Sequence, residues 1–203
     1  GRQEVLANHT YENRIKTMIS KLDEHFTNVE TSDQASDSQL DNYYHNIRHD
    51  ILPLIPEDAQ CILEVGCASG YTGKELKRLR KIFIAGIELN PIAAEEARQN
   101  LDDVLVGNIE NMDLPYQENS FDCIVMADVI EHLIDPLSAL KKLKPYLKEG
   151  GTIIASIPNV QFFGLVNHLI EGNWTYAKEG ILDETHLRFF TYKEIELLFK
   201  NAG

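Results

Sequence analysis

Short apolar runs alternate with helical patterns from residue 61 onward. The strand-like runs, rich in Ile, Val, Leu and Phe, are residues 61–65, 82–88, 103–107, 121–127 and 151–157. Between them, the spacing of apolar residues predicts helices over residues 71–80, 91–100 and 136–147. Strands that alternate with helices are typical of βαβ units, in which helices cover both faces of a parallel sheet. The pattern therefore predicts an α/β protein with a doubly wound, mostly parallel sheet.

The pattern before the first strand is helical instead. Apolar residues at helical spacing predict one helix over residues 11–28 and a second over residues 40–54, where prolines stop it. The polar stretch 29–38 between them predicts a linker. We therefore expect two parts: N-terminal helices and a linker over residues 1–58, covering the ligand site, and a ligand-binding domain over residues 59–203.

The composition adds limits on location and partners. The chain has 203 residues, and its three cysteines show no CxxC spacing, which favours a reducing compartment. The sequence shows no apolar run long enough to span a membrane and no signal peptide, so we expect a cytoplasmic protein. The formal net charge of −13 disfavours nucleic-acid binding, which depends on Lys and Arg. A small-molecule partner is the expectation that remains.

In a doubly wound sheet, ligands bind at the carboxyl ends of the strands. The first of these ends carries EVGCASGYTGKE, residues 64–75. The dinucleotide fingerprint GxGxxG fails there, because Ala68 and Tyr71 replace two of its glycines, and the P-loop pattern fails as well. What remains is Glu64 followed by Gly66 and Gly70, in a loop whose backbone can approach a ligand. An ordinary tight turn is the alternative.

The next two strand ends carry polar residues suited to a nucleoside. Glu88 ends the second run, where a carboxylate can accept hydrogen bonds from two ribose hydroxyls. Asn108 and Ile109 follow the third run, where they can contact the edge and face of a base. Asp128, Glu131 and His132 follow the fourth run within five positions. They indicate either a metal or acid–base cluster, or only the polar face of a helix start.

Four stretches in this order resemble a class I S-adenosylmethionine-dependent methyltransferase. They are ILEVGCASGYTG, IELNP, GNIENMDLPYQENSFDCIVMADVIEHLIDP and GGTIIASIPN, and they span about residues 60–160. The resemblance implies a Rossmann-like methyltransferase fold, S-adenosylmethionine as cofactor and S-adenosylhomocysteine as product. The cofactor-binding residues that it implies are Glu64, Gly66, Cys67, Ala68, Gly70, Glu88, Leu89, Asn108, Ile109, Ala127 and Asp128.

Within this implied set, Glu64, Gly66 and Gly70 line the methionine part, Glu88 binds the ribose, and Asp128 lies near the sulfonium. The sequence departs from the family at two positions. The middle glycine of the loop is Ala68, whose methyl is tolerable if its backbone dihedrals are ordinary. The usual aspartate on the adenine side is Asn108, which can still accept a hydrogen bond from the adenine amino group.

Residues 156–192 resemble a bacterial methyltransferase subgroup associated with glycosyltransferases and surface polysaccharide synthesis, through SIPN, GNW and ILDETHLRFFT. This resemblance implies O-methylation of a sugar or glycan-precursor hydroxyl. The alternatives are O-methylation of a quinone-like or other small hydroxylated molecule, and an inactive cofactor-binding module of a larger protein. Phe162, Phe163, Trp174 and Tyr176 are candidates for an aromatic lid over the acceptor, with plain packing as the alternative.

DVIEHL and THLRFFT are similar to two pieces of the metal site in small-RNA 3′-terminal 2′-O-methyltransferases, and quinone-ring O-methyltransferases carry a related first piece. The matching residues are Asp128, Glu131, His132 and His186. One interpretation makes His132 or His186 the general base on the acceptor hydroxyl, and these two are our candidate catalytic residues. In a second, all four residues hold a divalent metal. In a third, Glu131 caps or pairs locally and the histidines are structural.

Class I methyltransferases usually end their sheet with two further strands. The present sequence stops at Gly203, after a helical stretch over residues 192–201, so we predict a five-stranded sheet. Its uncovered edge favours a homodimer. Tyr43, Tyr44 and Arg48 are candidates to reach the cofactor's carboxylate.

Overall fold

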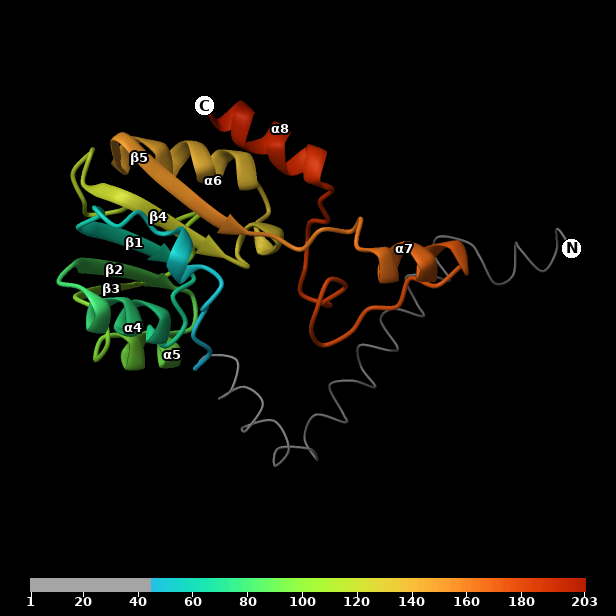
Figure 1. Ribbon diagram of the computed structural model, residues 1–203, viewed down its shortest axis with the longest axis horizontal. Helices are drawn as coiled ribbons and strands as arrows, with labels where there is room; N and C mark the ends of the chain where they lie inside the picture. Colours follow the sequence, from blue (N-terminus) through green and yellow to red (C-terminus); the bar gives the residue numbers. More distant parts are fainter. Residues whose placement is uncertain (1–44) are drawn as a thin grey trace, which may run out of the picture. The chain divides into compact units, whose positions relative to one another are not determined.

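The computed structural model describes residues 45–203 (Figure 1). All the elements discussed below belong to one compact unit, residues 44–203. The helix predicted over residues 11–28, the linker, Tyr43 and Tyr44 lie outside the described residues. The division of the chain at residue 58 stays a prediction.

The five predicted strands form one parallel sheet, which confirms the fold class. The strands are β1 (Cys61–Val65), β2 (Phe83–Glu88), β3 (Asp103–Val106), β4 (Phe121–Ala127) and β5 (Leu147–Ser156). Their order is β3-β2-β1-β4-β5, and every neighbouring pair is parallel. The order reverses between β1 and β4, and in such sheets the ligand crevice lies outside the carboxyl ends at this switch point.

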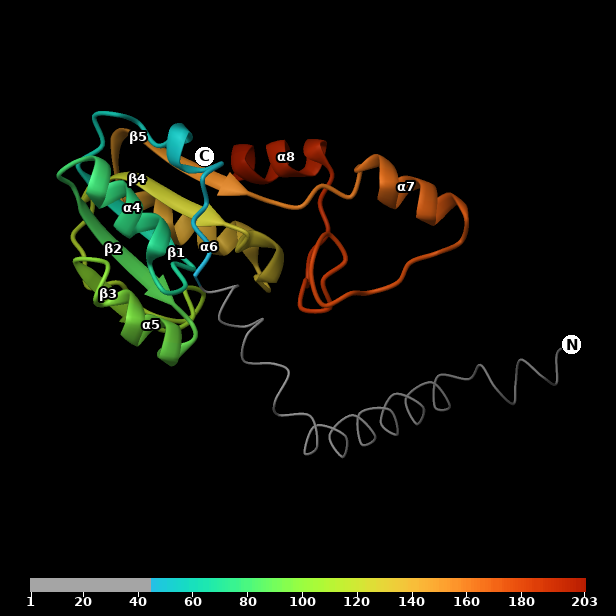
Figure 2. The same ribbon diagram turned by 60° about the horizontal axis from the view of Figure 1, so that its bottom comes forward.

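Helices cover both faces of the sheet, as Figures 1 and 2 show. The α-helices are α4 (Tyr71–Leu79), α5 (Pro91–Ala97), α6 (Pro136–Leu143), α7 (Phe163–Ile170) and α8 (Tyr192–Ala202). Three 3₁₀ turns complete the list: η1 (Leu52–Leu54), η2 (Ile130–His132) and η3 (Lys144–Tyr146). Helices α4 and α5 lie on one face and α6 and α8 on the other, whereas α7 lies away from the sheet in both views.

Alternate residues of the central strands enter the two layers of the core. In β4, Cys123 and Val125 belong to the cluster that includes residues of α4 and α5. Ile124 and Met126 belong to the second cluster, with residues of α6. Because successive side chains of a strand point to opposite faces, a strand covered on both faces must be apolar throughout. This explains the uninterrupted apolar runs in the sequence.

Several predicted boundaries are wrong in the described region. Helix α5 ends at Ala97 instead of residue 100, and β5 begins at Leu147 instead of residue 151. Two helix predictions need a physical explanation. The helix predicted over residues 40–54 is absent from residue 45 to 51, where the chain forms turns and irregular structure, and only η1 follows. Ile51 and Ile55 are buried in the sheet core instead, so tertiary packing decides this segment. The helix predicted to reach residue 147 ends at Leu143, because Pro145 starts the tighter η3 turn.

β5 forms one edge of the five-stranded sheet, and α8 packs beside it. An apolar groove on this side is lined by Ile153, Ala155, Ile157, Tyr192, Ile195 and Phe199. The number of strands agrees with the prediction for the described residues, and the homodimer stays a prediction. Within the described part of the chain, every helix falls short of the length and apolar character needed to cross a membrane.

Candidate active site

The loop between β1 and α4 turns sharply through left-handed backbone conformations. Gly66, Ala68 and Gly70 have φ angles of 70°, 48° and 75°. A side chain at Gly66 is excluded, because an ideal Cβ there would lie 2.6 Å from a methyl carbon of Val129. The condition under which the methyl of Ala68 is tolerable, ordinary backbone dihedrals, is therefore not met. A left-handed alanine costs about 1–2 kcal/mol, so this loop stores strain.

Glu64, near the end of β1, and Cys67, in the loop that follows, are both buried. Burial raises the pKa of the Cys67 thiol, which lies inside the core, so only the backbone of Cys67 is available to a ligand. Glu64 is 8% exposed. Burial, with the nearby charge of Glu88, raises the pKa of Glu64 from 4.5 to about 8. Strand β1 therefore places a buried carboxyl group, whose protonated form is favoured at neutral pH, directly before this loop.

Glu88 ends β2 with its carboxylate held by two backbone amides. The Ala68 amide donates to Oε2 and the Asn90 amide to Oε1, each at 2.8 Å. The side chain of Asn90 in turn caps α5, where it accepts from the Ile92 amide at 2.9 Å. Each carboxylate oxygen keeps a further lone pair, so both can still accept hydrogen bonds from two neighbouring hydroxyls.

The next two strand ends offer a mixed apolar and polar surface. Leu89 is 66% exposed beside Glu88, so its side chain is free to contact a flat apolar ring. The Asn108 side-chain oxygen accepts from the Glu110 amide at 2.8 Å, which fixes its amide at the end of β3. Ile109 is only 4% exposed and packs in the core, so its side chain supports this surface from below.

Asp128, directly after the half-buried Ala127 at the end of β4, is bound to Arg48 and Ser156. Its backbone has a φ of 53°, a left-handed conformation. The Ser156 hydroxyl donates to Oδ1 at 2.8 Å, and the Arg48 guanidinium donates to Oδ2. Arg48 also donates to Ser156 at 3.0 Å and to both carboxylate oxygens of Asp50. These contacts hold the segment around Arg48 over the carboxyl end of the sheet.

Glu131, in η2, has a buried carboxylate without a hydrogen bond. The residue is 1% exposed, and neither carboxylate oxygen has a partner among residues 45–203. Burial raises the pKa of Glu131 from 4.5 to about 8. The interpretation in which Glu131 caps or pairs locally is therefore wrong for the described residues. A buried polar group of this kind requires a specific explanation, such as a bound ion.

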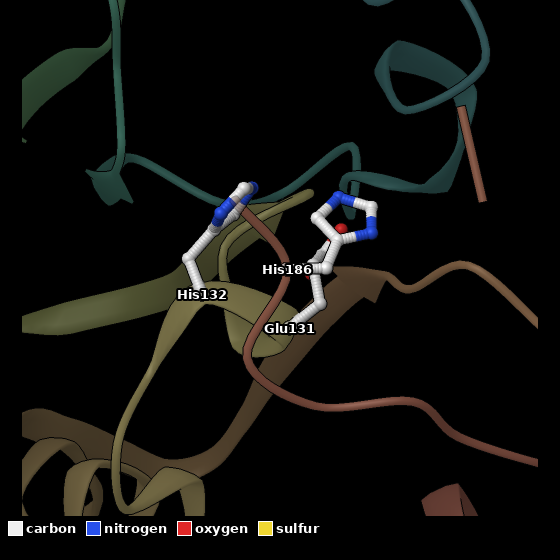
Figure 3. Close-up of side chains that lie close together, drawn as sticks. All are labelled: Glu131, His132 and His186. Carbon is white, nitrogen blue, oxygen red and sulfur yellow. The ribbon is translucent and has the colours of Figure 1, made fainter. Parts of the chain in front are cut away.

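Two imidazoles lie beside this carboxylate. His132 follows Glu131 in η2, and His186 comes from the loop before α8, so that the three side chains gather at one place (Figure 3). The ring centroids of the two histidines are 4.8 Å apart, in an edge-to-face arrangement. One ligand atom from each of the three residues lies within 4.8 Å of the others. Burial lowers the pKa of His132, which favours its neutral form at neutral pH.

Backbone contacts bring the loop with His186 onto η2. The carbonyl oxygen of Glu131 accepts from the Leu187 amide at 2.9 Å and from the Arg188 amide at 3.0 Å. The Nδ1 atom of His186 lies 3.1 Å from the carbonyl oxygen of Ile181. That of His132 lies 3.3 Å from the carbonyl oxygen of Thr185. A carbonyl can only accept, so in the neutral form of each ring Nδ1 carries the proton and Nε2 keeps the lone pair.

The predicted aromatic lid is divided between two places. Trp174 and Tyr176 lie against Phe189, with ring centroids 5.5 and 6.2 Å away. The Phe189 ring is itself 6.4 Å from the His186 ring, so this aromatic group borders the cluster of Glu131, His132 and His186. Phe162 and Phe163 lie at the start of α7 with most of their surface exposed. Their role in a lid stays a prediction.

Comparison with solved structures defines the class of protein. One similar structure is an S-adenosylmethionine-dependent methyltransferase from Thermotoga maritima, described as a possible histamine N-methyltransferase. It is 28% identical in sequence and superimposes with a TM-score of 0.59, and the match covers 76% of this chain and 68% of that chain. A putative methyltransferase from Haloferax volcanii, solved with its Trm112 activator, shares the fold with a TM-score of 0.64 at 20% identity, over 84% of this chain and 73% of that chain.

A family profile described as a methyltransferase domain matches residues 36–203, so this chain belongs to that family. Its fold is that of S-adenosylmethionine-dependent methyltransferases, and S-adenosylmethionine is its cofactor. The mitochondrial ubiquinone biosynthesis O-methyltransferase of Dictyostelium discoideum is 24% identical over 71% of this chain and 50% of that protein. Its counterpart from Acinetobacter baylyi is 28% identical over 48% of this chain and 43% of that protein. The chain thus spans about half the length of these relatives.

The structure brings most of the predicted site residues to the carboxyl end of the sheet. One group lies around Glu88, and the other consists of Glu131, His132 and His186. It separates Asp128 from the metal-ligand set that the resemblance implied, because among the described residues only Glu131, His132 and His186 form a group whose ligand atoms all lie within 4.8 Å of one another, whereas Asp128 contacts Arg48 and Ser156. Sequence reasoning missed Ser156 and the orienting carbonyls of Ile181 and Thr185. No sequence signal marks a carbonyl for such a role, because every residue has one.

Proposed function

We propose that the protein transfers the methyl group of S-adenosylmethionine to a hydroxyl of a small molecule. The observation that carries this proposal is the position of the cluster of Glu131, His132 and His186. It begins three residues after Asp128, just past the carboxyl end of β4 at the switch point of the sheet. The acceptor therefore meets polar, proton-accepting groups next to the place expected for the sulfonium.

In the proposed complex, Glu88 binds the two ribose hydroxyls with the free lone pairs of its amide-held carboxylate. Leu89 contacts the adenine face and Asn108 its edge, and the loop of Gly66, Ala68 and Gly70 follows the methionine part. Arg48 is a candidate for the cofactor's carboxylate. For that role it would give up part of its present contact with Asp50, which is exposed to solvent.

The reaction is an in-line displacement, so alignment and exclusion of water supply much of the rate. An acceptor oxygen attacks the methyl carbon, a C–O bond forms, and the C–S bond breaks to leave neutral S-adenosylhomocysteine. The hydroxyl proton has to leave during this step. In their neutral forms, His132 and His186 have a lone pair on Nε2 that can accept this proton.

Two acceptor classes fit the proposal. The O-methyltransferases of ubiquinone biosynthesis among the relatives favour a phenol or quinol. The resemblance of residues 156–192 to a polysaccharide-associated subgroup favours a sugar hydroxyl. Both acceptors present a ring that can pack against the aromatic group of Trp174, Tyr176 and Phe189, since such faces accept flat apolar surfaces.

The test is a transfer assay with isotopically labelled S-adenosylmethionine. The purified protein is incubated with a panel of catechols, quinols, sugar nucleotides and glycan precursors. We expect S-adenosylhomocysteine to form, with one methyl group added to at least one acceptor, as measured by mass spectrometry. Tight cofactor binding without transfer to any hydroxylated acceptor would contradict the proposal and would favour an inactive cofactor-binding module.

A further inference from the structure

The buried carboxylate of Glu131 is the feature that the methyltransferase reaction does not explain. An ionised carboxylate taken out of water without a partner is strongly disfavoured. Most buried polar groups in proteins are satisfied by hydrogen bonds, by ordered water or by a metal. At Glu131 both oxygens lack a partner among the described residues, and the side chain is 1% exposed.

The two neighbouring histidines are oriented as metal ligands usually are. In both, Nδ1 faces a backbone carbonyl, of Thr185 for His132 and of Ile181 for His186. This arrangement fixes the ring and leaves Nε2 as the electron-pair donor, which is the usual outer-shell arrangement of metal-bound histidine. Glu131 and the two histidines thus offer one carboxylate oxygen and two ring nitrogens as metal ligands, all within 4.8 Å of one another (Figure 3).

We propose that Glu131, His132 and His186 bind one divalent first-row transition metal ion, with positions left for the acceptor hydroxyl and water. Three protein ligands with open positions are typical of catalytic rather than structural sites. Two imidazoles and one carboxylate favour Zn²⁺ or a similar ion over Mg²⁺, which prefers oxygen ligands. Asp128 is left out of the ligand set, because the group whose ligand atoms all lie within 4.8 Å of one another consists of Glu131, His132 and His186.

This inference rests on the proposed function for the role of the ion but not for its binding. A cation at this place lowers the pKa of a hydroxyl bound to it, so the proton leaves more easily before the methyl group is transferred. The imidazoles then act as ligands, and solvent takes the proton. The acceptor class this favours is a hydroxylated ring that binds the ion through oxygen.

The experiment measures metal binding alone, without cofactor or acceptor. The chain is treated with EDTA, dialysed and titrated with ZnCl₂ and, separately, MgCl₂ by calorimetry, with elemental analysis after equilibrium dialysis. We expect one Zn²⁺ per chain, bound at least about tenfold more tightly than Mg²⁺. Glu131→Gln and His186→Ala should each weaken Zn²⁺ binding by at least about 10–100-fold.

Matched controls come from α7 and the residue after it. His168→Ala and Glu171→Gln remove the same side-chain types at exposed positions and should leave Zn²⁺ binding unchanged. Circular dichroism checks that each variant is folded. Absence of Zn²⁺ binding to the wild type, or equal binding to Glu131→Gln and wild type, would overturn the proposal.

Thermal unfolding provides a second readout that a purely structural Glu131 would not give. Zn²⁺ should raise the Tm of the wild type but not that of Glu131→Gln, since an ion that binds only the folded state stabilises it. In metal-free protein, Glu131→Gln should unfold at the same or a higher temperature, because it removes an unpaired buried acid. A lower Tm in metal-free protein, together with a retained Zn²⁺ effect, would count against the site.

The two proposals fail in different ways. Zn²⁺ binding without methyl transfer to any acceptor would support the metal site and contradict the O-methyltransferase function. Full methyl transfer by EDTA-treated protein that binds no Zn²⁺ would support the O-methyltransferase function and overturn the metal site.

Discussion

The two sides of the site differ in how their carboxylates are satisfied. On the cofactor side, Glu88 is held by the amides of Ala68 and Asn90. On the acceptor side, Glu131 is more deeply buried and has no hydrogen-bond partner among residues 45–203. The carboxylate of Glu88 can accept further hydrogen bonds from neutral hydroxyl groups while it keeps these two contacts. The carboxylate of Glu131 has no partner among these residues, and the cation proposed above would offset its burial.

The two sides also differ in how they are assembled. The cofactor side consists of short loops directly after β1 and β2, so each functional residue is positioned by its own strand. The acceptor side joins η2 to a distant loop, as the contact between His132 and Thr185, 53 positions apart, illustrates. The acceptor side is therefore more sensitive to changes in the loop, and the cofactor side to changes in single strand ends.

The strongest test of this division removes an imidazole. His186→Ala should lower turnover about 10²–10⁴-fold, because the acceptor hydroxyl loses its activating group. Affinity for S-adenosylmethionine should stay close to that of the wild type, because the cofactor side is built separately. Steady-state kinetics and calorimetry measure the two effects, with His168→Ala as control. A matching loss of cofactor affinity would break the division between the two sides.

The reciprocal change is Glu88→Ala. Loss of two charge-assisted hydrogen bonds to the ribose should weaken S-adenosylmethionine binding by about 100-fold or more. Calorimetry gives the dissociation constant, and Glu95→Ala, at an exposed position of α5, is the matched control. Zinc binding should remain intact in Glu88→Ala. Unchanged cofactor affinity would contradict the assignment of Glu88 to the ribose.

A third prediction concerns pH and Glu64. Burial in the folded state raises the pKa of Glu64 from 4.5 to about 8. Between these two pH values the folded state therefore binds more protons than the unfolded state. The stability from this group is present at low pH and is lost as pH rises through about 8. Glu64→Gln should therefore reduce the fall in stability of the cofactor-free protein between pH 5 and 8 by at least about 2 kcal/mol. Urea unfolding across this range measures it, and an unchanged pH profile would contradict the burial argument.

The smallest expected effect is at Ala68. Ala68→Gly relieves the left-handed strain of this residue and should stabilise the protein by about 1 kcal/mol. For a chain of this size that raises the Tm by about 2–4 °C, which calorimetry can resolve. Ala139→Gly, inside α6, should lower the Tm instead, since glycine is unfavourable in a helix. A decrease at Ala68 would show that its methyl contributes packing that outweighs the strain.

Much of the fold was predictable because its strands are buried on both faces. An apolar run such as FDCIVMA has few alternatives to a central strand, and β4 has the bounds expected from it. Predictions failed where long-range packing competes with local preference. Residues 45–51 have helical spacing but bury Ile51 in the sheet core, and Ala68 adopts a dihedral that its residue type disfavours.

The sequence by itself determined the order of strands and helices along the chain, the family, and which residues follow the strand ends. These features depend on local periodicity and on motifs of a few residues, which survive without knowledge of distant contacts. Only the tertiary structure decided that Glu131 is buried without a partner, that Asp128 is bound by Arg48, and that His186 lies beside His132. Burial and ligand geometry are properties of segments packed together, so no single stretch of the chain encodes them.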